Sequence, residues 1–395
     1  MKLRIGVIFG GASVEHEVSV ISALQAIQNM DNAKYEVVPI YISKDRLWYC
    51  GNEFGMIENY RNVDTLLKKS SPVMLTCLDG EFCLFSTKGL FHKIIDKIDV
   101  AFPIVHGQNV EDGSLVGFLE TIGIPYVGSG VLGSCLGQDK VVMKQVFASS
   151  NIPVVPYVWF FENDYYERKE SILKDIQEMG YPVVVKPARL GSSVGIHFAK
   201  EESELLKYIE EAFTYDRKIV VEKAISDLIE VNCSVLGTVH CMEVSEIEQV
   251  FSDHDILTFQ DKYVGNGKTK GSSKGMVNAS RVIPADISDD LSNQVQNLSK
   301  QVFSTLNFSG VVRIDFLIDA NTNEVYVNEP NVIPGSLAFY LWEPKGVSYS
   351  KLLDEMITFG IKEYKERNQK ITCFDTNILE NFGGLKGSKG KLNGK

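Results

Sequence analysis

Long apolar runs alternate with amphipathic segments in the first third of the chain. The runs at 3–9, 35–43 and 98–107 are almost continuously apolar, which is typical of strands buried on both faces. Residues 13–30 have a helical pattern, and Ser13 is a candidate N-cap. Strands that alternate with helices predict an N-terminal doubly wound parallel α/β domain, whose ligand-bearing loops follow the carboxyl ends of the strands.

The pattern after residue 130 mixes shorter strands and helices. A helix is expected around Asp139–Ala148, and a second helix at 170–179. Strands are expected at 151–160, 181–188 and 218–225.

From about residue 228 the strands read as antiparallel. Residues 228–237 form the first of them, and a helix at 288–307 precedes a hairpin at 311–335. A helix at 347–368 follows the hairpin. The remaining residues, 369–395, are rich in Gly and Lys, which predicts a flexible tail rather than a docking segment.

The most informative candidate site lies in the hairpin VVRIDFLIDANTNEVYVNEPNVIPG. Arg313 and Asp315 share one face of its first strand, and Glu329 and Asn331 share one face of its second. Folding about the polar turn brings Asp315 close to Glu329. An oxygen-only cluster of this kind suits Mg²⁺, which usually shares such a site with substrate phosphates. Solvated charges on the wet face of an ordinary hairpin are the alternative, and this segment alone favours that alternative.

Composition narrows the function classes. The 395 residues have room for two or three domains, and the hydrophobic and charged contents are those of an ordinary globular protein. The formal net charge of −11 argues against a nucleic-acid partner. The 7 cysteines are scattered, with no CxxC pair, which indicates reduced thiols. No signal peptide or membrane span is evident, so we predict a cytoplasmic protein with no membrane partner.

Two loops follow predicted N-terminal strands. GGASVEHE lacks GxGxxG, which disfavours a nicotinamide enzyme. Glu15 in this loop can hold an ammonium group, although a helix-start glutamate is locally the better interpretation. In HGQNVEDG, the residues His106, Glu111 and Asp112 are as consistent with a structural role as with a functional one.

The segment VVVKPARLGSSVG favours anion binding. Lys186 ends a buried strand, from which an ammonium group can reach phosphates. The loop 191–195 offers backbone N–H groups and two hydroxyls, although it lacks the P-loop pattern. A plain Gly/Ser turn is the alternative, and the preceding lysine makes the functional interpretation preferable.

Two further segments carry weaker signals. Glu222, Lys223 and Glu230 could surround an adenosine. Lys262 and Tyr263 precede a long Gly-rich loop, which is either a lid or a flexible insertion.

In this order, the motifs resemble the D-alanine–D-alanine ligase family of ATP-grasp enzymes over roughly residues 3–365. The matching segments are GGASVEHEVS, HGQNVEDG, GIPYVGSG, DK at 139–140, VKPARLGSSVG, VEKAI, DKY at 261–263, RID at 313–315 and NEPNVIPG. The resemblance implies an N-terminal α/β domain at 1–129 that binds the first amino acid. It also implies a small central α+β domain at 130–225 and a catalytic α+β domain with an antiparallel sheet at 226–368, whose lid lies near 255–278.

The resemblance also implies roles for individual residues. ATP phosphates would contact Lys140, Lys186 and, on lid closure, Lys262. The adenosine would lie among Glu222, Lys223, Ile225 and Glu230, although the spacing from the first to the last is one residue longer than usual. Two Mg²⁺ ions, replaceable by Mn²⁺, would be held by Asp315, Glu329 and Asn331, and a monovalent K⁺ is a further ion compatible with the resemblance.

The amino-acid substrates would meet a second set of residues. Glu15 would bind the ammonium group of the first D-amino acid and would form a hydrogen-bonded set with Ser192 and Tyr263. Arg313 and the backbone N–H of Gly335 would stabilise the tetrahedral oxyanion. The resemblance further implies a homodimer.

The chain departs from the family pattern in three places, and the third concerns the second substrate. Val110 stands where the family has a glycine, and Val332 stands where it has a threonine. After Gly335 the family has a serine-containing segment, whereas this chain reads SLAFYLWEPKG, with Tyr340 near the expected serine. Ser336, Tyr340 or a backbone group could substitute. Tyr263 favours an amine-accepting member over the D-lactate-using relatives.

The leading hypothesis is ATP-dependent ligation of two D-alanines through a D-alanyl phosphate, which would supply peptidoglycan synthesis. A D-alanine–D-serine ligase or another carboxylate–amine ligase is the alternative. A nucleotide-binding relative without turnover is the third hypothesis, and the retained Arg313, Asp315, Glu329 and Asn331 argue against it.

Overall fold

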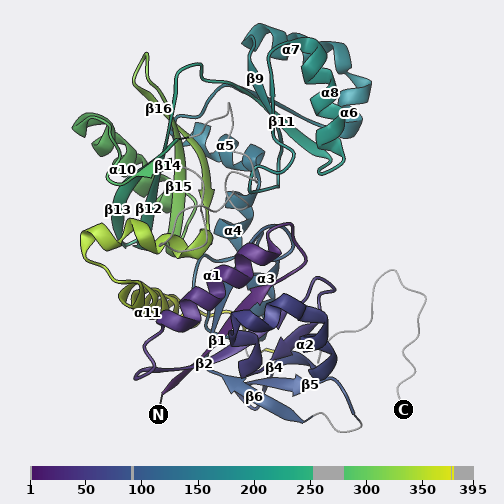
Figure 1. The fold of residues 1–395 in the computed structure, drawn as a ribbon, viewed down its shortest axis with the longest axis vertical. Helices are drawn as coiled ribbons and strands as arrows, with labels where there is room; N and C mark the ends of the chain where they lie inside the picture. Colours follow the sequence, from purple (N-terminus) through teal and green to yellow (C-terminus); the bar gives the residue numbers. More distant parts are fainter. Residues whose placement is uncertain (1, 90–92, 252–279, 375, 378–395) are drawn as a thin grey trace.

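The computed structural model describes residues 2–89, 93–251, 280–374 and 376–377 (Figure 1). Within these residues the strands form three sheets, here called the N-terminal, central and C-terminal sheets. Lys262, Tyr263, the lid expected near 255–278 and most of the tail 369–395 lie outside the described residues.

The N-terminal sheet has the strand order β6-β5-β4-β3-β2-β1-β7. Its parallel part is formed by the three predicted apolar runs, as β1 Leu3–Gly10, β2 Tyr35–Ile42 and β7 Val100–Val105. An antiparallel extension that the apolar pattern did not indicate adds β3 Trp48–Cys50, β4 Pro72–Leu78, β5 Glu81–Ser86 and β6 Ile94–Ile98. Its described helices include α1 His16–Asn29, α2 Val63–Lys69 and α3 Ser114–Ile122, and two 3₁₀ turns at Asn52–Gly55 and Ile57–Asn62.

Helices cover both faces of this sheet. Successive residues of β1 point to opposite faces, so their contacts show what covers each face. Ile5, Val7 and Phe9 pack in one cluster with residues of α1 and of the C-terminal helix α11 Tyr349–Asn368. Ile8 packs on the other face, with residues of α3. The doubly wound arrangement is therefore confirmed.

The start of α1 differs from the prediction. The helix begins at His16, and Ser13 does not cap it. The Ser13 hydroxyl instead donates a hydrogen bond of 2.6 Å to the carbonyl oxygen of His106, in the loop after β7. A tertiary contact between two strand-end loops thus takes the side chain that the sequence pattern assigned to a cap.

The central sheet has the order β10-β9-β11-β8 and is antiparallel. The strands are β8 Tyr157–Phe161, β9 Val183–Pro187, β10 His197–Ala199 and β11 Lys218–Lys223. One face packs against α6 Glu162–Glu167, α7 Lys169–Met179 and α8 Glu202–Phe213. The strand expected at 151–160 begins only at Tyr157, since Pro153 and Pro156 have no N–H to donate to a ladder.

The C-terminal sheet is antiparallel, in the order β14-β13-β12-β15-β16. The strands are β12 Leu228–Thr238, β13 Cys241–Phe251, β14 Ser280–Val282, β15 Gly310–Asp319 and β16 Glu324–Asn331. One face packs on α10 Asp289–Thr305 through Val302 and Phe303. The other elements nearby are α4 Val131–Gln138, α5 Lys140–Ser149 and the 3₁₀ segments η3 Gly335–Leu341 and η4 Glu343–Lys345.

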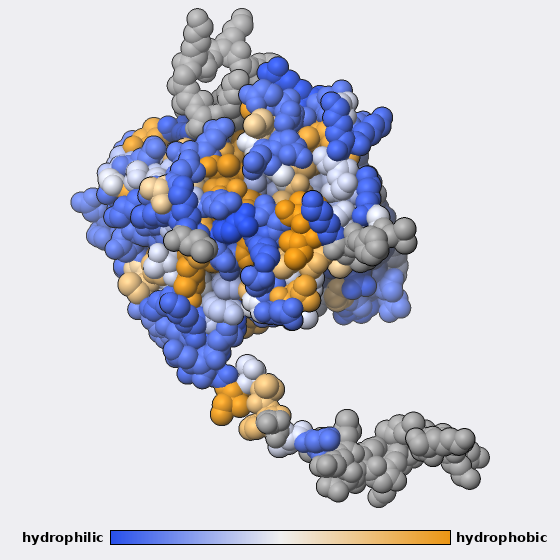
Figure 2. Space-filling view, turned by 90° about the horizontal axis from the view of Figure 1, so that it is seen from below, coloured by the Kyte–Doolittle hydropathy of each residue, from blue (hydrophilic) through white to orange (hydrophobic). Residues whose placement is uncertain are grey.

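Each sheet lies within one of the three ranges expected from the sequence, whereas the boundaries after residues 129 and 225 stay predictions. Seen from below, the molecule shows mostly hydrophilic residues, with hydrophobic ones gathered toward the middle of the face (Figure 2). Among the described residues, no helix combines the length and apolar character needed to cross a membrane.

Candidate active site

A large cavity lies where the central sheet, the C-terminal sheet and the loops of the N-terminal sheet meet. It encloses about 1480 Å³, including space open to solvent. The central sheet contributes Lys186 and Glu222, and the C-terminal sheet contributes Asp315 and Glu329. Glu15 closes the cavity from the N-terminal side, so residues far apart in the sequence share one space.

The C-terminal hairpin β15–β16 places its polar residues on the cavity side. Asp315 and Glu329 are cross-strand partners, as expected from the alternation in the sequence. Arg313 donates to both oxygens of Asp315, from Nε at 2.7 Å and from Nη2 at 2.9 Å. The amide of Asn331 donates to Asp315 Oδ2 at 3.1 Å.

Arg313 is almost completely buried. Burial opposes its charge, but the Asp315 carboxylate more than offsets burial and raises the pKa of Arg313 well above its ordinary value. The guanidinium therefore stays charged and is held in one orientation by its bidentate pair.

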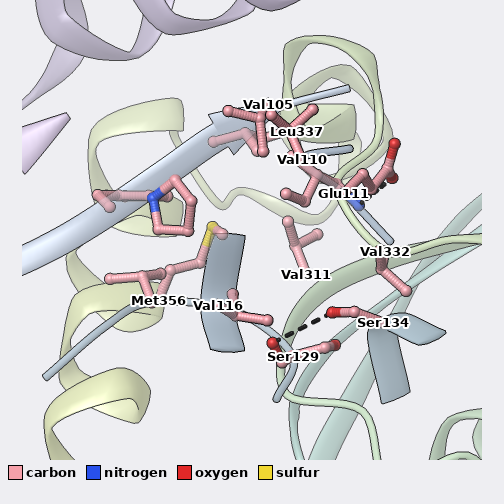
Figure 3. A pocket seen from close by; sticks show the side chains of 15 residues that line it. Val105, Val110, Glu111, Val116, Ser129, Ser134, Val311, Val332, Leu337 and Met356 are labelled. Carbon is pink, nitrogen blue, oxygen red and sulfur yellow. Dashed lines mark hydrogen bonds between the residues drawn. The ribbon is translucent and has the colours of Figure 1, made fainter. Parts of the chain in front are cut away.

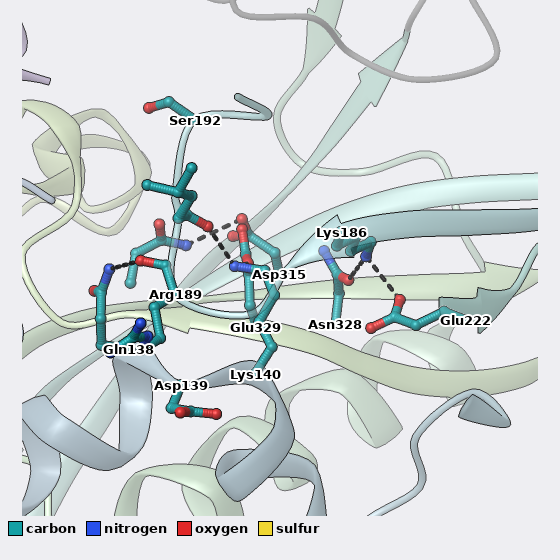
Figure 4. A network of polar contacts seen from close by, with 12 residues as sticks. Gln138, Asp139, Lys140, Lys186, Arg189, Ser192, Glu222, Asp315, Asn328 and Glu329 are labelled. Atoms are coloured by element: carbon teal, nitrogen blue, oxygen red, sulfur yellow. Dashed lines mark hydrogen bonds and ion pairs between the residues drawn. The ribbon is translucent and has the colours of Figure 1, made fainter. Parts of the chain in front are cut away.

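Lys140, at the start of α5, lies behind the cavity wall at Glu329. Asp139 caps this helix by accepting hydrogen bonds from the N–H groups of Val141 and Val142, both at 3.1 Å. The cap directs Lys140, whose ammonium group contacts Glu329 Oε2 at 2.8 Å and donates to the carbonyl oxygen of Leu190 at 2.7 Å (Figure 4).

A second group of lysines surrounds Glu222. Its two oxygens contact the ammonium groups of Lys186 at 2.7 Å and Lys144 at 3.0 Å. Lys186 also donates to Asn328 Oδ1 at 3.0 Å, which links the central sheet to the C-terminal sheet (Figure 4).

The pKa values of this group follow from its burial and charges. Burial would raise the pKa of Glu222, but Lys144 and Lys186 lower it to about 2. Burial lowers the pKa of Lys144, whereas at Lys186 the attraction of Glu222 outweighs burial and raises the pKa. Glu222 is therefore ionised at neutral pH, and its carboxylate holds Lys186 at the cavity wall.

Two carboxylates meet at the N-terminal end of the cavity. Ser192, in the loop after β9, donates a hydrogen bond to Glu15. Glu111 accepts from the N–H of Gly107 at 2.8 Å and from the N–H of Ile333 at 3.1 Å. Burial, together with the nearby Glu15, raises the pKa of Glu111 to about 8. The pair is a ready partner for a positive group, because two neighbouring carboxylates repel each other.

The residues expected near adenosine lie together at the other end. Ile225 and Glu230 line the cavity, close to the apolar side chains of Phe198 and Leu228. Lys223 also lines it, while its ammonium group donates to the carbonyl oxygens of Gly180 and Tyr181, both at 3.1 Å.

Gly335 lines the cavity at the start of η3, whereas Tyr340, further along η3, is not part of the cavity lining. The Tyr340 hydroxyl donates to Glu248 at 3.2 Å. Ser336 is held by its own N–H, which donates to Ser22 Oγ at 2.9 Å. The η3 backbone has positive φ values at Ser336, Leu337 and Ala338.

The two valine departures lie in one place. Val110 and Val332 both line a smaller cavity of about 420 Å³ between the N-terminal and C-terminal sheets, where Glu111 also lies (Figure 3). Val110 packs in the cluster that includes residues of α3, whereas Val332 packs in the cluster of the C-terminal sheet.

Sequence reasoning missed several residues of the site, namely Lys144, Asn328 and Glu111 as a pair with Glu15. Lys144 could have been found, since it lies four residues after Lys140 and thus on the same helical face. Asn328 stands next to Glu329 but one position off the expected alternation, and its contact depends on the irregular register after Asp315.

The donor set can accept a divalent cation. Within the described part of the chain, no group of three or more His, Cys, Asp and Glu side chains is arranged to hold a metal ion. Asp315, Glu329 and the amide oxygen of Asn331 make a smaller, oxygen-only set. Such a set suits Mg²⁺ that completes its coordination with water and phosphate.

Comparison with known proteins agrees with this geometry. A family model described as D-ala D-ala ligase N-terminus matches residues 4–129, and one described as D-ala D-ala ligase C-terminus matches residues 146–358. A D-alanine–D-alanine ligase of Thermosipho africanus is 38% identical over 96% of this chain and 98% of its own length. One of Caldicellulosiruptor bescii is 36% identical over 93% and 97%.

Solved structures show the same relationship. The D-alanine–D-alanine ligase from Coxiella burnetii has a TM-score of 0.77 and 30% identity, and the match covers 93% of this chain and 96% of that one. The VanG D-Ala:D-Ser ligase from Enterococcus faecalis has a TM-score of 0.74 and 30% identity, with 91% and 100% covered. With both family models matched and relatives aligned over almost its whole length, this chain belongs to the D-alanine–D-alanine ligase family.

Proposed function

We propose that this protein joins two D-alanine molecules in a reaction driven by ATP, through a D-alanyl phosphate, and so supplies the dipeptide for peptidoglycan synthesis. One observation carries the proposal. A single cavity is lined by the carboxylates of Glu15 and Glu111, which suit an ammonium group, and also by Lys186 and the paired carboxylates of β15 and β16.

The first D-alanine binds with its ammonium group at Glu15. The Ser192 hydroxyl orients the Glu15 carboxylate, and Tyr263 joins this set when the lid closes. Glu111 lies nearby with its pKa raised to about 8, so an arriving ammonium group favours the ionised form of this carboxyl.

The triphosphate lies along the lysines. Lys140 and Lys186 are each paired with a carboxylate, so their ammonium groups are already held where phosphate oxygens arrive. Lys262 completes the contacts to the γ-phosphate. The adenosine occupies the end lined by Glu222, Lys223, Ile225 and Glu230.

Asp315, Glu329 and Asn331 would hold two divalent cations. When bound, Mg²⁺ would supply positive charge against the transferring phosphoryl group. Mn²⁺ has similar preferences for oxygen ligands and substitutes for it, and a K⁺ ion accompanies the site.

The reaction has two steps. The carboxylate of the first D-alanine attacks the γ-phosphorus and ADP leaves, which produces the acyl phosphate. The free amine of the second D-alanine then attacks the acyl carbon and loses a proton, and inorganic phosphate leaves. Arg313 and the N–H of Gly335 stabilise the oxyanion of the tetrahedral intermediate, since both are fixed before the charge develops.

The first experiment follows ADP release with the purified protein. ADP and phosphate should form only when D-alanine and Mg²⁺ are both present, and mass spectrometry should detect the dipeptide. ADP release at the same rate without any amino acid would contradict the ligase function.

A D-serine acceptor is the second candidate. The segment after Gly335 departs from the family pattern, and a D-Ala:D-Ser ligase is among the structures that resemble this chain. A panel of second amino acids offered with D-alanine, with the products weighed by mass spectrometry, separates the two candidates. If D-Ala–D-Ser were the main product, D-serine rather than D-alanine would be the acceptor.

Asp315→Asn tests the metal assignment. Removing one charge beside the transferring phosphoryl group should lower turnover by roughly a hundredfold or more. Mn²⁺ binding, measured by electron paramagnetic resonance with a nucleotide present, should weaken as well. Asp319→Asn, on the same strand but outside the cavity lining, is the matched control. Unchanged turnover and Mn²⁺ binding in Asp315→Asn would refute the assignment.

We further propose that the protein is a cytoplasmic homodimer. Light scattering on the purified protein measures the mass directly, and a value near the 44.1 kDa of one chain would contradict the dimer.

A further inference from the structure

The polar residues of the C-terminal sheet continue beyond the hairpin. Cross-strand partners point to the same face of a sheet. Glu248 pairs with Asn232, and Asn232 pairs with Asp315, which pairs with Glu329. Asn232, Asp315 and Glu329 all line the cavity, so Glu248 lies on the cavity face as well.

A second row of cross-strand partners, next to the first, ends at Arg281. This residue on β14 pairs with Val250, which in turn pairs with Glu230. Val250 and Glu230 line the cavity, so Arg281 stands on the same face, one strand beyond the lining.

Arg281, Glu248 and Tyr340 form one cluster at this edge. The Glu248 side chain is 1% exposed and accepts hydrogen bonds from Asn232 Nδ2 and the Tyr340 hydroxyl, both at 3.2 Å. Arg281 Nη1 approaches Glu248 Oε1 at 3.4 Å. The Arg281 guanidinium lies over the Tyr340 ring, 4.6 Å from its centroid. Burial and Glu248 raise the pKa of Tyr340, so its hydroxyl stays a donor.

The cations of the site differ in how firmly they are held. Arg313 has two of its nitrogens on Asp315, Lys140 contacts Glu329 at 2.8 Å and Lys186 contacts Glu222 at 2.7 Å. Arg281 contacts its carboxylate through one nitrogen at the longer distance of 3.4 Å, and its side chain is 27% exposed. A guanidinium presents five donors, so Arg281 can meet an incoming carboxylate without giving up Glu248.

We propose that Arg281 binds the carboxylate of the second amino acid, and that Tyr340 and Glu248 position it. This assignment rests on the proposed function. Arg281 would take the task of the serine that the family has after Gly335 and that this chain lacks. The Tyr340 ring supports the guanidinium from one side, and Glu248 fixes its rotation. Tyr340 thus acts through Arg281 and does not touch the substrate itself.

The test compares two acceptors in the intact protein, D-alanine and D-alanine amide, which lacks the carboxylate. The ratio of kcat/KM for the two acceptors should fall by about tenfold or more in Arg281→Gln, as expected when a charge-assisted hydrogen bond is lost. The KM values for ATP and for the first D-alanine should stay within about twofold. Arg281→Lys should recover part of the preference, because it keeps the charge but loses the planar fork.

Arg367→Gln is the matched control. Arg367 also lies over a tyrosine, Tyr126, at 5.0 Å from the ring centroid, and it contacts Glu120 at 3.2 Å, but it does not line the active-site cavity. This variant should leave the acceptor ratio unchanged.

The outcomes separate this inference from the proposed function. Wild-type protein that releases no ADP in response to D-alanine contradicts the function itself. An active wild type whose acceptor ratio is unchanged by Arg281→Gln overturns the role of Arg281. The ratio is insensitive to partial misfolding, since a smaller active fraction lowers both rates equally. Tyr340→Leu, which removes the supporting ring, should weaken the preference in the same direction.

Discussion

Among single residues, Glu222 shows most clearly how burial and charge act together. Its carboxylate is shared by Lys144, which is fully buried, and Lys186, which reaches the cavity. Removing one member of a buried ionic group leaves the others without compensation, which costs far more than the loss of an exposed pair. Glu222 therefore contributes both to folding and to the position of Lys186, the lysine that we propose binds phosphate.

Glu222→Gln should lower the free energy of unfolding by about 3–5 kcal/mol at neutral pH, because two buried ammonium groups lose their shared anion. The folded-state pKa of about 2 lies below the ordinary value of 4.5, so the wild-type advantage is complete above pH 4.5. The advantage is lost as the pH falls from 4.5 toward 2. Urea unfolding at several pH values measures this gap between wild type and variant.

The exposed pair of Lys174 and Glu178 supplies the control. Glu178→Gln should change stability by less than about 0.5 kcal/mol, since this contact of 3.7 Å lies in solvent. A gap between wild type and Glu222→Gln that stays constant down to acidic pH would show that charge is not its cause.

At the level of elements, the loops after β7 and β9 meet around the Glu15 carboxylate. Gly107 and Gly191 approach it so closely that a Cβ on either would lie 2.8 Å or 3.0 Å from Glu15 Oε2. Gly107 also has φ +83, a conformation that disfavours side chains. These glycines let two strand-end loops close on one carboxylate.

Gly107→Ala should raise the KM for the first D-alanine by about tenfold or more, because the added methyl displaces the carboxylate that binds the ammonium group. Gly123→Ala is the matched control, with φ +79 and no atom within 4 Å of the new Cβ. Both variants should lose about 1 kcal/mol of stability through backbone strain. Steady-state kinetics and thermal unfolding separate the two effects, and an equal KM in both variants would contradict the steric argument.

For the molecule taken together, the active site exists only where the sheets converge. A hydrogen bond from Lys186 to Asn328 links the central and C-terminal sheets. A second one, from the N–H of Ile333 to Glu111, links the C-terminal region to the N-terminal region. A nucleotide in the cavity would contact the central and C-terminal sheets at once, so its binding should stabilise the folded arrangement.

A non-hydrolysable ATP analogue with Mg²⁺ should therefore raise the unfolding temperature. At a hundred times its dissociation constant, the ligand should add about 2.7 kcal/mol. Lys186→Met should show a smaller rise, since it removes a cation from the phosphate end. Calorimetry measures both proteins, and a wild-type temperature unaffected by the analogue would contradict the placement of the nucleotide.

Much of the fold was predictable because its signals are local. The buried runs of β1, β2 and β7, the helix expected around Asp139–Ala148 and the alternation of Arg313 and Asp315 depend on neighbours a few residues away. The antiparallel strands β3 to β6 were not predicted, because they are short or mix buried with exposed positions and so have no continuous apolar run.

The sequence by itself determined most helices and strands and which kinds of side chain lie on each of their faces. The periodicity of a strand or helix depends only on residues that are close in the sequence. The tertiary structure decided which side chains meet. Ser13 became a link to His106 rather than a cap, and Tyr340 became a partner of Glu248, 92 positions away. Such pairings depend on how sheets pack and on which buried polar groups must be satisfied, and those long-range conditions leave no local period in the sequence.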